Sequence, residues 1–109
     1  MRSRLHHVAI NTAEFDWYTA FFTDIFGMET ERTAGASPVR KIWFCEGIQL
    51  NEFPEASGSG GLCDHISIAV PDIPDTVRRA CECGCSPLPD GAHWFALPNG
   101  IRVELKPFD

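Results

Sequence analysis

The chain has 109 residues, of which 44% are hydrophobic and 22% are charged, an ordinary composition for a globular domain. This length suffices for one hydrophobic core, and no apolar run approaches the roughly 20 residues that span a bilayer. With no secretory signal at the N-terminus, we expect a cytoplasmic protein without a membrane segment. Nine basic against 15 acidic residues give a net charge of −6, which argues against a nucleic-acid partner because phosphate backbones require a positive surface.

The first half of the chain is predicted to form a strand, a helix and three strands. Residues 6–10 alternate as a strand does, and aromatic residues at spacings of three and four then predict a helix that ends at Gly27. Asn11 or Thr12 could cap the start of this helix. Strands are predicted in three further segments, residues 28–33, 39–46 and 48–53.

The second half repeats this order. A strand is predicted at residues 63–70, and a helix follows with acidic residues at its start and Gly84 as its C-cap. Short strands follow at three segments, residues 86–89, 92–97 and 101–108. The sequence therefore predicts one α+β domain of two tandem βαβββ modules, with module one at residues 1–54, a flexible linker at 55–61 and module two at 62–109.

The five cysteines of the chain are odd in number and follow no C-x-x-C spacing. This gives little support to a disulfide framework or a zinc ribbon. Three of them fall in the run CECGC at residues 81–85, which could bind a soft metal. We expect packed or exposed reduced thiols there instead.

Equivalent positions of the two modules carry candidate metal ligands. His7 and His65 each precede an apolar alternation, and the matching segments I-Q-L and V-E-L place Gln49 and Glu104 near the end of each half. Histidine nitrogen and carboxylate or amide oxygen suit divalent ions, and no single turn of chain could supply all four ligands. Taken alone, each residue also fits an exposed or hydrogen-bonded role, so both interpretations stay open at this point.

The segments LHHVAI, FFTDIFGMETERT, IQL, DHISIAV and PNGIRVEL occur in the order found in the vicinal-oxygen-chelate superfamily. The chain resembles this family over essentially its whole length. The family includes glyoxalase I, methylmalonyl-CoA epimerase, extradiol dioxygenases, fosfomycin-resistance enzymes and bleomycin-binding proteins. The resemblance implies that the two modules form a curled mixed sheet around a cleft, with one metal ligand from the first and last strand of each module.

Carried onto this chain, the resemblance implies four ligands for one divalent ion (nickel, zinc, cobalt, manganese or iron(II)): His7, Gln49, His65 and Glu104. A second alignment of the two halves pairs Asn51 with Glu104. Asn51 shares a face with Gln49, so either could reach the ion, and the I-x-L form favours Gln49.

The resemblance also implies a function. We expect a metal-dependent, glyoxalase-like lyase or isomerase that acts on a small vicinal-oxygen substrate, namely an α-hydroxycarbonyl, a thioester or a hemithioacetal. It would abstract a proton and stabilise the enediolate, with Glu104 as the base. The alternatives are an extradiol-type iron dioxygenase and a non-catalytic small-molecule binding or resistance protein. Arg40, Lys41 or Arg102 could receive an anionic substrate, or could simply be solvated. A homodimer is expected because many relatives complete the cleft by dimerising or swapping modules.

Overall fold

The computed structural model describes residue 2, residues 5–56 and residues 63–108. The chain divides into two compact units, residues 1–57 and 58–109, called module one and module two from here on, while the predicted domain bounds stay predictions. Most of the predicted linker at residues 55–61 lies outside the described residues. The single domain and the cleft between the modules stay predictions.

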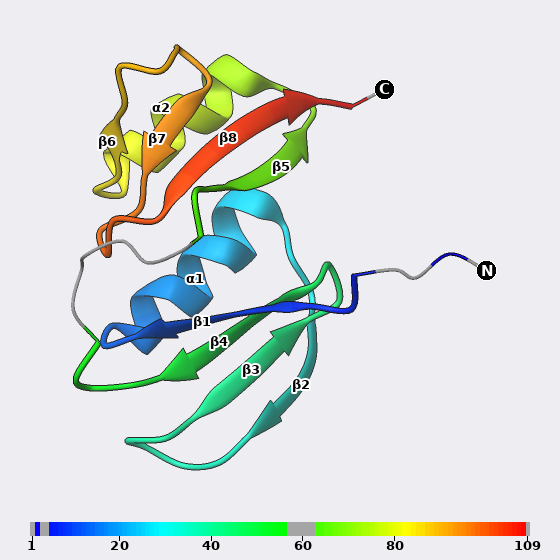
Figure 1. Ribbon diagram of the computed structural model, residues 1–109, viewed down its shortest axis with the longest axis vertical. Helices are drawn as coiled ribbons and strands as arrows, with labels where there is room; N and C mark the ends of the chain where they lie inside the picture. The colour runs from blue at the N-terminus through cyan, green and yellow to red at the C-terminus, as the bar shows by residue number, and fades with distance from the viewer. Residues whose placement is uncertain (1, 3–4, 57–62, 109) are drawn as a thin grey trace. The chain divides into compact units, whose positions relative to one another are not determined.

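Module one consists of a helix and a four-stranded mixed sheet (Figure 1). Its elements in chain order are β1 (Val8–Thr12), α1 (Phe15–Phe26), β2 (Thr30–Ala34), β3 (Lys41–Phe44) and β4 (Ile48–Glu52). The sheet order is β1-β4-β3-β2, in which β1 runs parallel to β4 and the other pairs are antiparallel. This arrangement confirms the predicted βαβββ order.

Module two repeats this topology with shorter elements. These elements are β5 (Ile66–Val70), α2 (Ile73–Glu82), β6 (Ser86–Pro87), β7 (Trp94–Ala96) and β8 (Arg102–Pro107). Its sheet order is β5-β8-β7-β6, with β5 parallel to β8 and the other pairs antiparallel. The two mixed sheets with their helices confirm the α+β class.

The C-terminal end of α1 lies where the sequence predicted it, but its N-cap is a different residue. Gly27 ends the helix in the left-handed region with φ 66, as predicted. The prediction of Asn11 or Thr12 as N-cap was wrong, because the cap is Glu14. Thr12 remains in β1, and its Oγ1 accepts a hydrogen bond from the backbone N–H of Glu14 at 3.0 Å.

The helix α2 begins with a side-chain cap and ends one residue earlier than expected. Asp72 accepts a hydrogen bond from the backbone N–H of Asp75 at 3.0 Å, which satisfies a free donor of the first turn. The C-cap is Cys83, and the predicted cap Gly84 follows it with φ 115. Gly84 therefore turns the chain just after the helix.

The five cysteines of the chain form no disulfide bonds.

Each helix covers one face of its own sheet. In module one α1 packs against β4 and contributes four buried aromatic residues, Phe15, Tyr18, Phe21 and Phe22. In module two α2 packs against β6, β7 and β8. Leu50 of β4 and Leu105 of β8 are both fully buried. Because strand side chains alternate, the preceding residues, Gln49 and Glu104, point to the opposite face of each sheet.

Candidate functional site

The strand register gives the two predicted histidines equivalent places. The β1 residue paired with Gln49 comes two positions after His7, and the β5 residue paired with Glu104 comes two positions after His65. The sequence had placed both histidines on strands, but each lies just before its strand, because β1 and β5 begin later than predicted. The pairing of β1 with β4 and of β5 with β8 thus brings each histidine toward its module's last strand.

The same register distinguishes Gln49 from Asn51. On the antiparallel side of β4, Trp43 is paired with Gln49, and on that side of β8, Trp94 is paired with Glu104. Gln49 is therefore the structural equivalent of Glu104, and Asn51 is not. The roles of these residues as metal ligands stay predictions.

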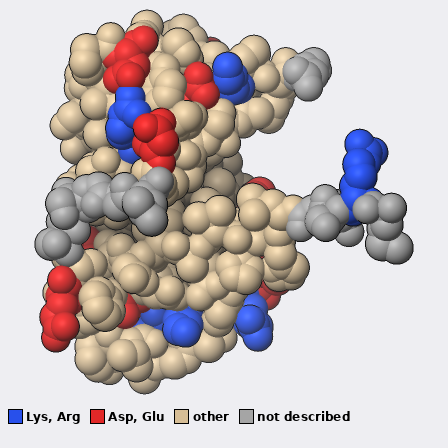
Figure 2. Space-filling view, viewed as in Figure 1, with Lys and Arg blue, Asp and Glu red and all other residues tan. Residues whose placement is uncertain are grey.

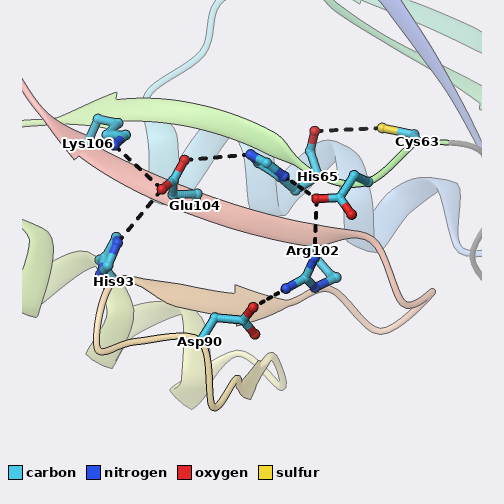
Figure 3. A network of polar contacts seen from close by, with 8 residues as sticks. Cys63, His65, Asp90, His93, Arg102, Glu104 and Lys106 are labelled. Atoms are coloured by element: carbon cyan, nitrogen blue, oxygen red, sulfur yellow. Dashed lines mark hydrogen bonds and ion pairs between the residues drawn. The ribbon is translucent and has the colours of Figure 1, made fainter.

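The structure brings two of the four predicted ligands together in module two. Nε2 of His65 lies 3.6 Å from Oε1 of Glu104, although 38 residues separate them in the chain (Figure 3). The side chain of Glu104 is 16% exposed and that of His65 is 32% exposed. An imidazole nitrogen and a carboxylate oxygen therefore face each other in a partly shielded place.

Asp64 orients the imidazole of His65. Nδ1 of His65 lies 2.6 Å from Oδ2 of Asp64. An ionised carboxylate can only accept, so Nδ1 of His65 donates this hydrogen bond, and Nε2 is the ring nitrogen that faces Glu104. The hydrogen bond with His65 lowers the pKa of Asp64, and the nearby charge of Arg102 lowers it further. Metal-binding histidines usually have such a carboxylate partner.

Two further groups adjoin Glu104. Nε2 of His93 lies 3.8 Å from Oε2 of Glu104, and Nζ of Lys106 lies 3.5 Å from the same oxygen. Sequence reasoning missed both residues, along with Asp64. The signals available were the Asp-His pair at residues 64 and 65 and the shared face of Glu104 and Lys106. Nothing in the local pattern pointed to His93.

Two of the cations considered for an anionic substrate are already paired. Arg102 forms ion pairs with the carboxylates of Asp64 and Asp90, and its guanidinium lies 4.9 Å from the ring centre of Trp94. In module one, Arg40 forms ion pairs with Asp16 and Glu52, both at 2.9 Å. These pairings favour a structural role for both arginines.

The Arg40 pair has a clear electrostatic signature. Hydrogen bonds from the Arg40 side chain lower the pKa of Glu52 to about 2, and the same contacts raise the pKa of Arg40. The Glu52 side chain is 11% exposed, so water screens this pair less than an ion pair on an open surface. Arg40 thereby links β4 to the start of α1 through Asp16.

The candidate ligands of module one contact a second histidine and two asparagine side chains. His7 is exposed, and its Nδ1 lies 2.7 Å from Nδ1 of His6. Gln49 is 7% exposed, and its Nε2 donates to Oδ1 of Asn51 at 2.7 Å. Asn51 in turn donates to Oδ1 of Asn11 at 3.1 Å. This network uses the amide nitrogen of Gln49 and leaves the oxygen as the atom that could bind a metal.

A hollow lies beside His7 in module one. It has a volume of about 440 Å³ and is lined by Leu5, His6, His7, Glu31, Trp43, Phe44 and Cys45. This volume falls within the range of small-molecule sites in proteins, about 300–1,000 Å³. Trp43 borders the hollow and is paired with Gln49, so the hollow adjoins the polar face of the sheet.

The described residues of either module alone form no complete metal site. Among the described residues, no three His, Cys, Asp or Glu side chains are placed to hold a metal ion together. His65 and Glu104 fit a metal in donor type and orientation, but they supply two ligands. The other two predicted ligands, His7 and Gln49, lie in module one, and a site shared by the four stays a prediction.

Charges of both signs are mixed over the surface drawn in Figure 2. Lysine and arginine side chains lie in separate places on that face, and on module two they adjoin aspartate and glutamate. The described cations therefore form no extended positive patch in this view.

No helix in the described part of the chain is long and apolar enough to cross a membrane.

Comparisons with known proteins identify the fold. Neither a protein-family model nor a curated protein matches the sequence. Among solved structures, the trypanothione-dependent glyoxalase I of Leishmania major is 19% identical, with a TM-score of 0.76 over 95% of this chain and 86% of that one. The fosfomycin resistance protein FosX of Listeria monocytogenes is 20% identical, with a TM-score of 0.80 over 100% of this chain and 94% of that one.

A variant of the Listeria protein has been solved in complex with Mn(II) and 1S,2S-dihydroxypropylphosphonic acid. It is 22% identical to this chain, with a TM-score of 0.78 over 96% of this chain and 92% of that one. Identities this low establish the fold and leave the reaction open. Together with the repeated βαβββ topology, these likenesses show that the chain has the fold of the vicinal-oxygen-chelate superfamily, as its sequence motifs predicted.

Proposed function

We propose that the protein is a metal-dependent, glyoxalase-like lyase or isomerase that acts on a small substrate with two vicinal oxygens. The observation that carries this proposal is the approach of His65 to Glu104 at 3.6 Å, with Asp64 orienting the imidazole. In the strand register, the pair is equivalent in position to His7 and Gln49 of module one. Such a repeat favours a shared ion over two unrelated surface contacts.

The four residues His7, Gln49, His65 and Glu104 would hold the ion. Two imidazoles, an amide oxygen and a carboxylate suit nickel, zinc, cobalt, manganese or iron(II). When bound, the ion would act as a Lewis acid that polarises the substrate oxygens and removes several kcal/mol from the barrier to proton abstraction.

The chain itself would bind the substrate and move the proton. Glu104 would take the proton from the carbon beside the substrate carbonyl and return it to the neighbouring position. Its low exposure of 16% keeps water from competing for that proton. The hollow beside His7, which Trp43 borders, has the volume of a small-molecule site.

The test combines metal loading with activity assays. Protein stripped by a chelator and reloaded with each of the five ions should catalyse hemithioacetal isomerisation or epimerisation beside a thioester. The metal-free protein and a loaded Glu104→Gln variant should not. Oxygen-dependent cleavage of a catechol by the iron(II) form would instead establish the dioxygenase alternative. Ligand binding without metal or turnover would establish the binding-protein alternative.

The assembly is part of the same proposal. We expect a homodimer, as the sequence resemblance implies, and propose a cytoplasmic location for it. Light scattering of the purified protein at micromolar concentration should give twice the mass of the 12.1 kDa chain. A mass of one chain would rule out a stable dimer without affecting the proposed chemistry.

A further inference from the structure

The two carboxylate oxygens of Glu104 face different partners (Figure 3). Oε1 lies 3.6 Å from Nε2 of His65, whereas Oε2 lies 3.8 Å from Nε2 of His93 and 3.5 Å from Nζ of Lys106. We propose that His93, together with Lys106, holds Oε2 so that Glu104 offers only Oε1 to the ion. His93 is then a positioning residue for the metal ligand, an inference that rests on the proposed function.

The backbone and a neighbouring glycine fix the place of His93. The backbone N–H of Leu105 donates to the carbonyl of His93 at 2.8 Å, which ties this residue to the strand that carries Glu104. A Cβ atom at Gly91 would lie 2.9 Å from Cε1 and 3.0 Å from Nδ1 of the His93 ring. Only a residue without a side chain leaves room for the imidazole in this position.

Module one fixes its own last-strand ligand in a comparable way. Asn51 follows Gln49 by two residues and accepts a hydrogen bond from its amide nitrogen at 2.7 Å. Lys106 follows Glu104 by two residues and contacts Oε2. In each module, therefore, one terminal atom of the candidate ligand contacts a neighbouring side chain: Nε2 of Gln49 in module one and Oε2 of Glu104 in module two. The other terminal atom, an oxygen, remains for the ion.

The contacts of Oε2 with His93 and Lys106 determine whether Glu104 binds the ion through one oxygen or through both. A free carboxylate can bind a cation through one oxygen or through both. Contacts of 3.5 and 3.8 Å are longer than direct hydrogen bonds, so each is weak, and the two act on Oε2 together. The side chains of Lys106 and His93 are 57% and 42% exposed, and the imidazole has fewer rotatable bonds to restrict than the lysine side chain. His93 should therefore contribute more to the fixed geometry.

The test is a cobalt(II) titration followed by visible absorption, which reports the number and geometry of the ligands. His93→Ala should raise the Kd for cobalt(II) about tenfold, the usual effect of losing a partner of a metal ligand, and should change the spectrum at saturation. Gly91→Ala should shift both readouts in the same direction, because it keeps the imidazole but displaces it. His93→Gln should restore the wild-type spectrum, since its amide N–H lies near the position of Nε2.

The control is Ala92→Ser, a change at an exposed residue of the same loop. It should leave both the Kd and the spectrum unchanged. Wild-type spectra and affinity in both His93→Ala and Gly91→Ala would overturn the role of His93 and leave the proposed function intact. No cobalt(II) binding by the wild-type protein would overturn the proposed function, and this inference with it.

Discussion

Module one and module two share a topology and a strand register but fill the two faces of their sheets differently. The helix of module one buries four aromatic residues, Phe15, Tyr18, Phe21 and Phe22. The buried residues of α2 are Thr76 and Ala80, and the larger buried side chains of module two come from its strands, among them Phe95, Val103 and Leu105. The repeat therefore preserves the path of the backbone while its core is packed with different side chains.

The polar faces differ as much as the cores. Module one presents an amide network around Gln49 and a hollow beside His7. Module two presents charged and ionisable groups around Glu104, with Asp64 behind His65. Of the four predicted ligands, the one carboxylate, Glu104, therefore lies in module two, and the one amide, Gln49, lies in module one.

Matched core substitutions test whether the two differently packed cores contribute equally to stability. Leu50 and Leu105 each follow the candidate ligand of their strand and are fully buried. Replacing either by alanine should lower the free energy of unfolding by about 2–5 kcal/mol, because it removes buried methyl groups and leaves a cavity. Denaturant unfolding of the two variants measures this loss. A loss well below 1 kcal/mol in one of them would show that its module is not packed as described.

Moving the negative charge from Glu104 to the position of Gln49 tests whether both residues bind the ion. Glu104→Gln should weaken binding of a divalent ion by more than about 100-fold, because Glu104 is the one predicted ligand with a negative charge. The reciprocal change Gln49→Glu should strengthen binding. Calorimetric titration with zinc or cobalt measures both, with the exposed residue Glu82→Gln as the control. Equal affinities in all three variants would refute the assignment.

Weakening the contact between Asp64 and His65 should reduce metal affinity by a smaller factor. Asp64→Asn keeps the size of the side chain but makes the acceptor neutral, so the hold on Nδ1 of His65 weakens. Affinity for the ion should fall about tenfold, the lower end of the range for such partners. The same titration measures it. Unchanged affinity would mean that Asp64 does not orient a metal ligand.

Removing the ion pair between Arg40 and Glu52 should have the smallest effect, a loss of thermal stability that depends on pH. Glu52 has a pKa lowered from 4.5 to about 2, so the stabilisation from its pair with Arg40 is fully present above pH 4.5 and is lost as the pH falls toward 2. Glu52→Gln should lower the Tm at pH 7 by a few degrees, and its difference from the wild type should shrink over that range. Thermal unfolding at several pH values measures this. A difference that does not change with pH would contradict it.

Much of the fold and of the candidate site follows from local sequence. Alternation, aromatic spacing and Gly27 were enough to place most elements, because each depends on residues close together in the chain. The repeat of His7 at His65 and of Gln49 at Glu104 was visible for the same reason. The register then added what the sequence left open, since it pairs Gln49 and not Asn51 with the position of Glu104.

The residues that surround Glu104 could not be predicted in this way. His93 reaches Oε2 of Glu104 from the turn before β7, and its ring position depends on Gly91 and on the backbone of Leu105. These contacts are set by strand pairing and by side-chain direction, which no periodicity in the sequence encodes. The cap of α1 was mispredicted for a related reason, because β1 extends through Thr12 and displaces the helix start.

The most direct test of the division between the modules is elemental analysis of the reloaded and dialysed protein. It should be made on the wild type and on two matched variants, His7→Ala and His65→Ala. The wild type should retain about one divalent ion per chain. His65→Ala should lose most of it, and His7→Ala should lose less, because Asp64 orients His65 toward Glu104. A wild-type chain that retains no ion, or an equal loss in the two variants, would contradict the unequal roles of the modules.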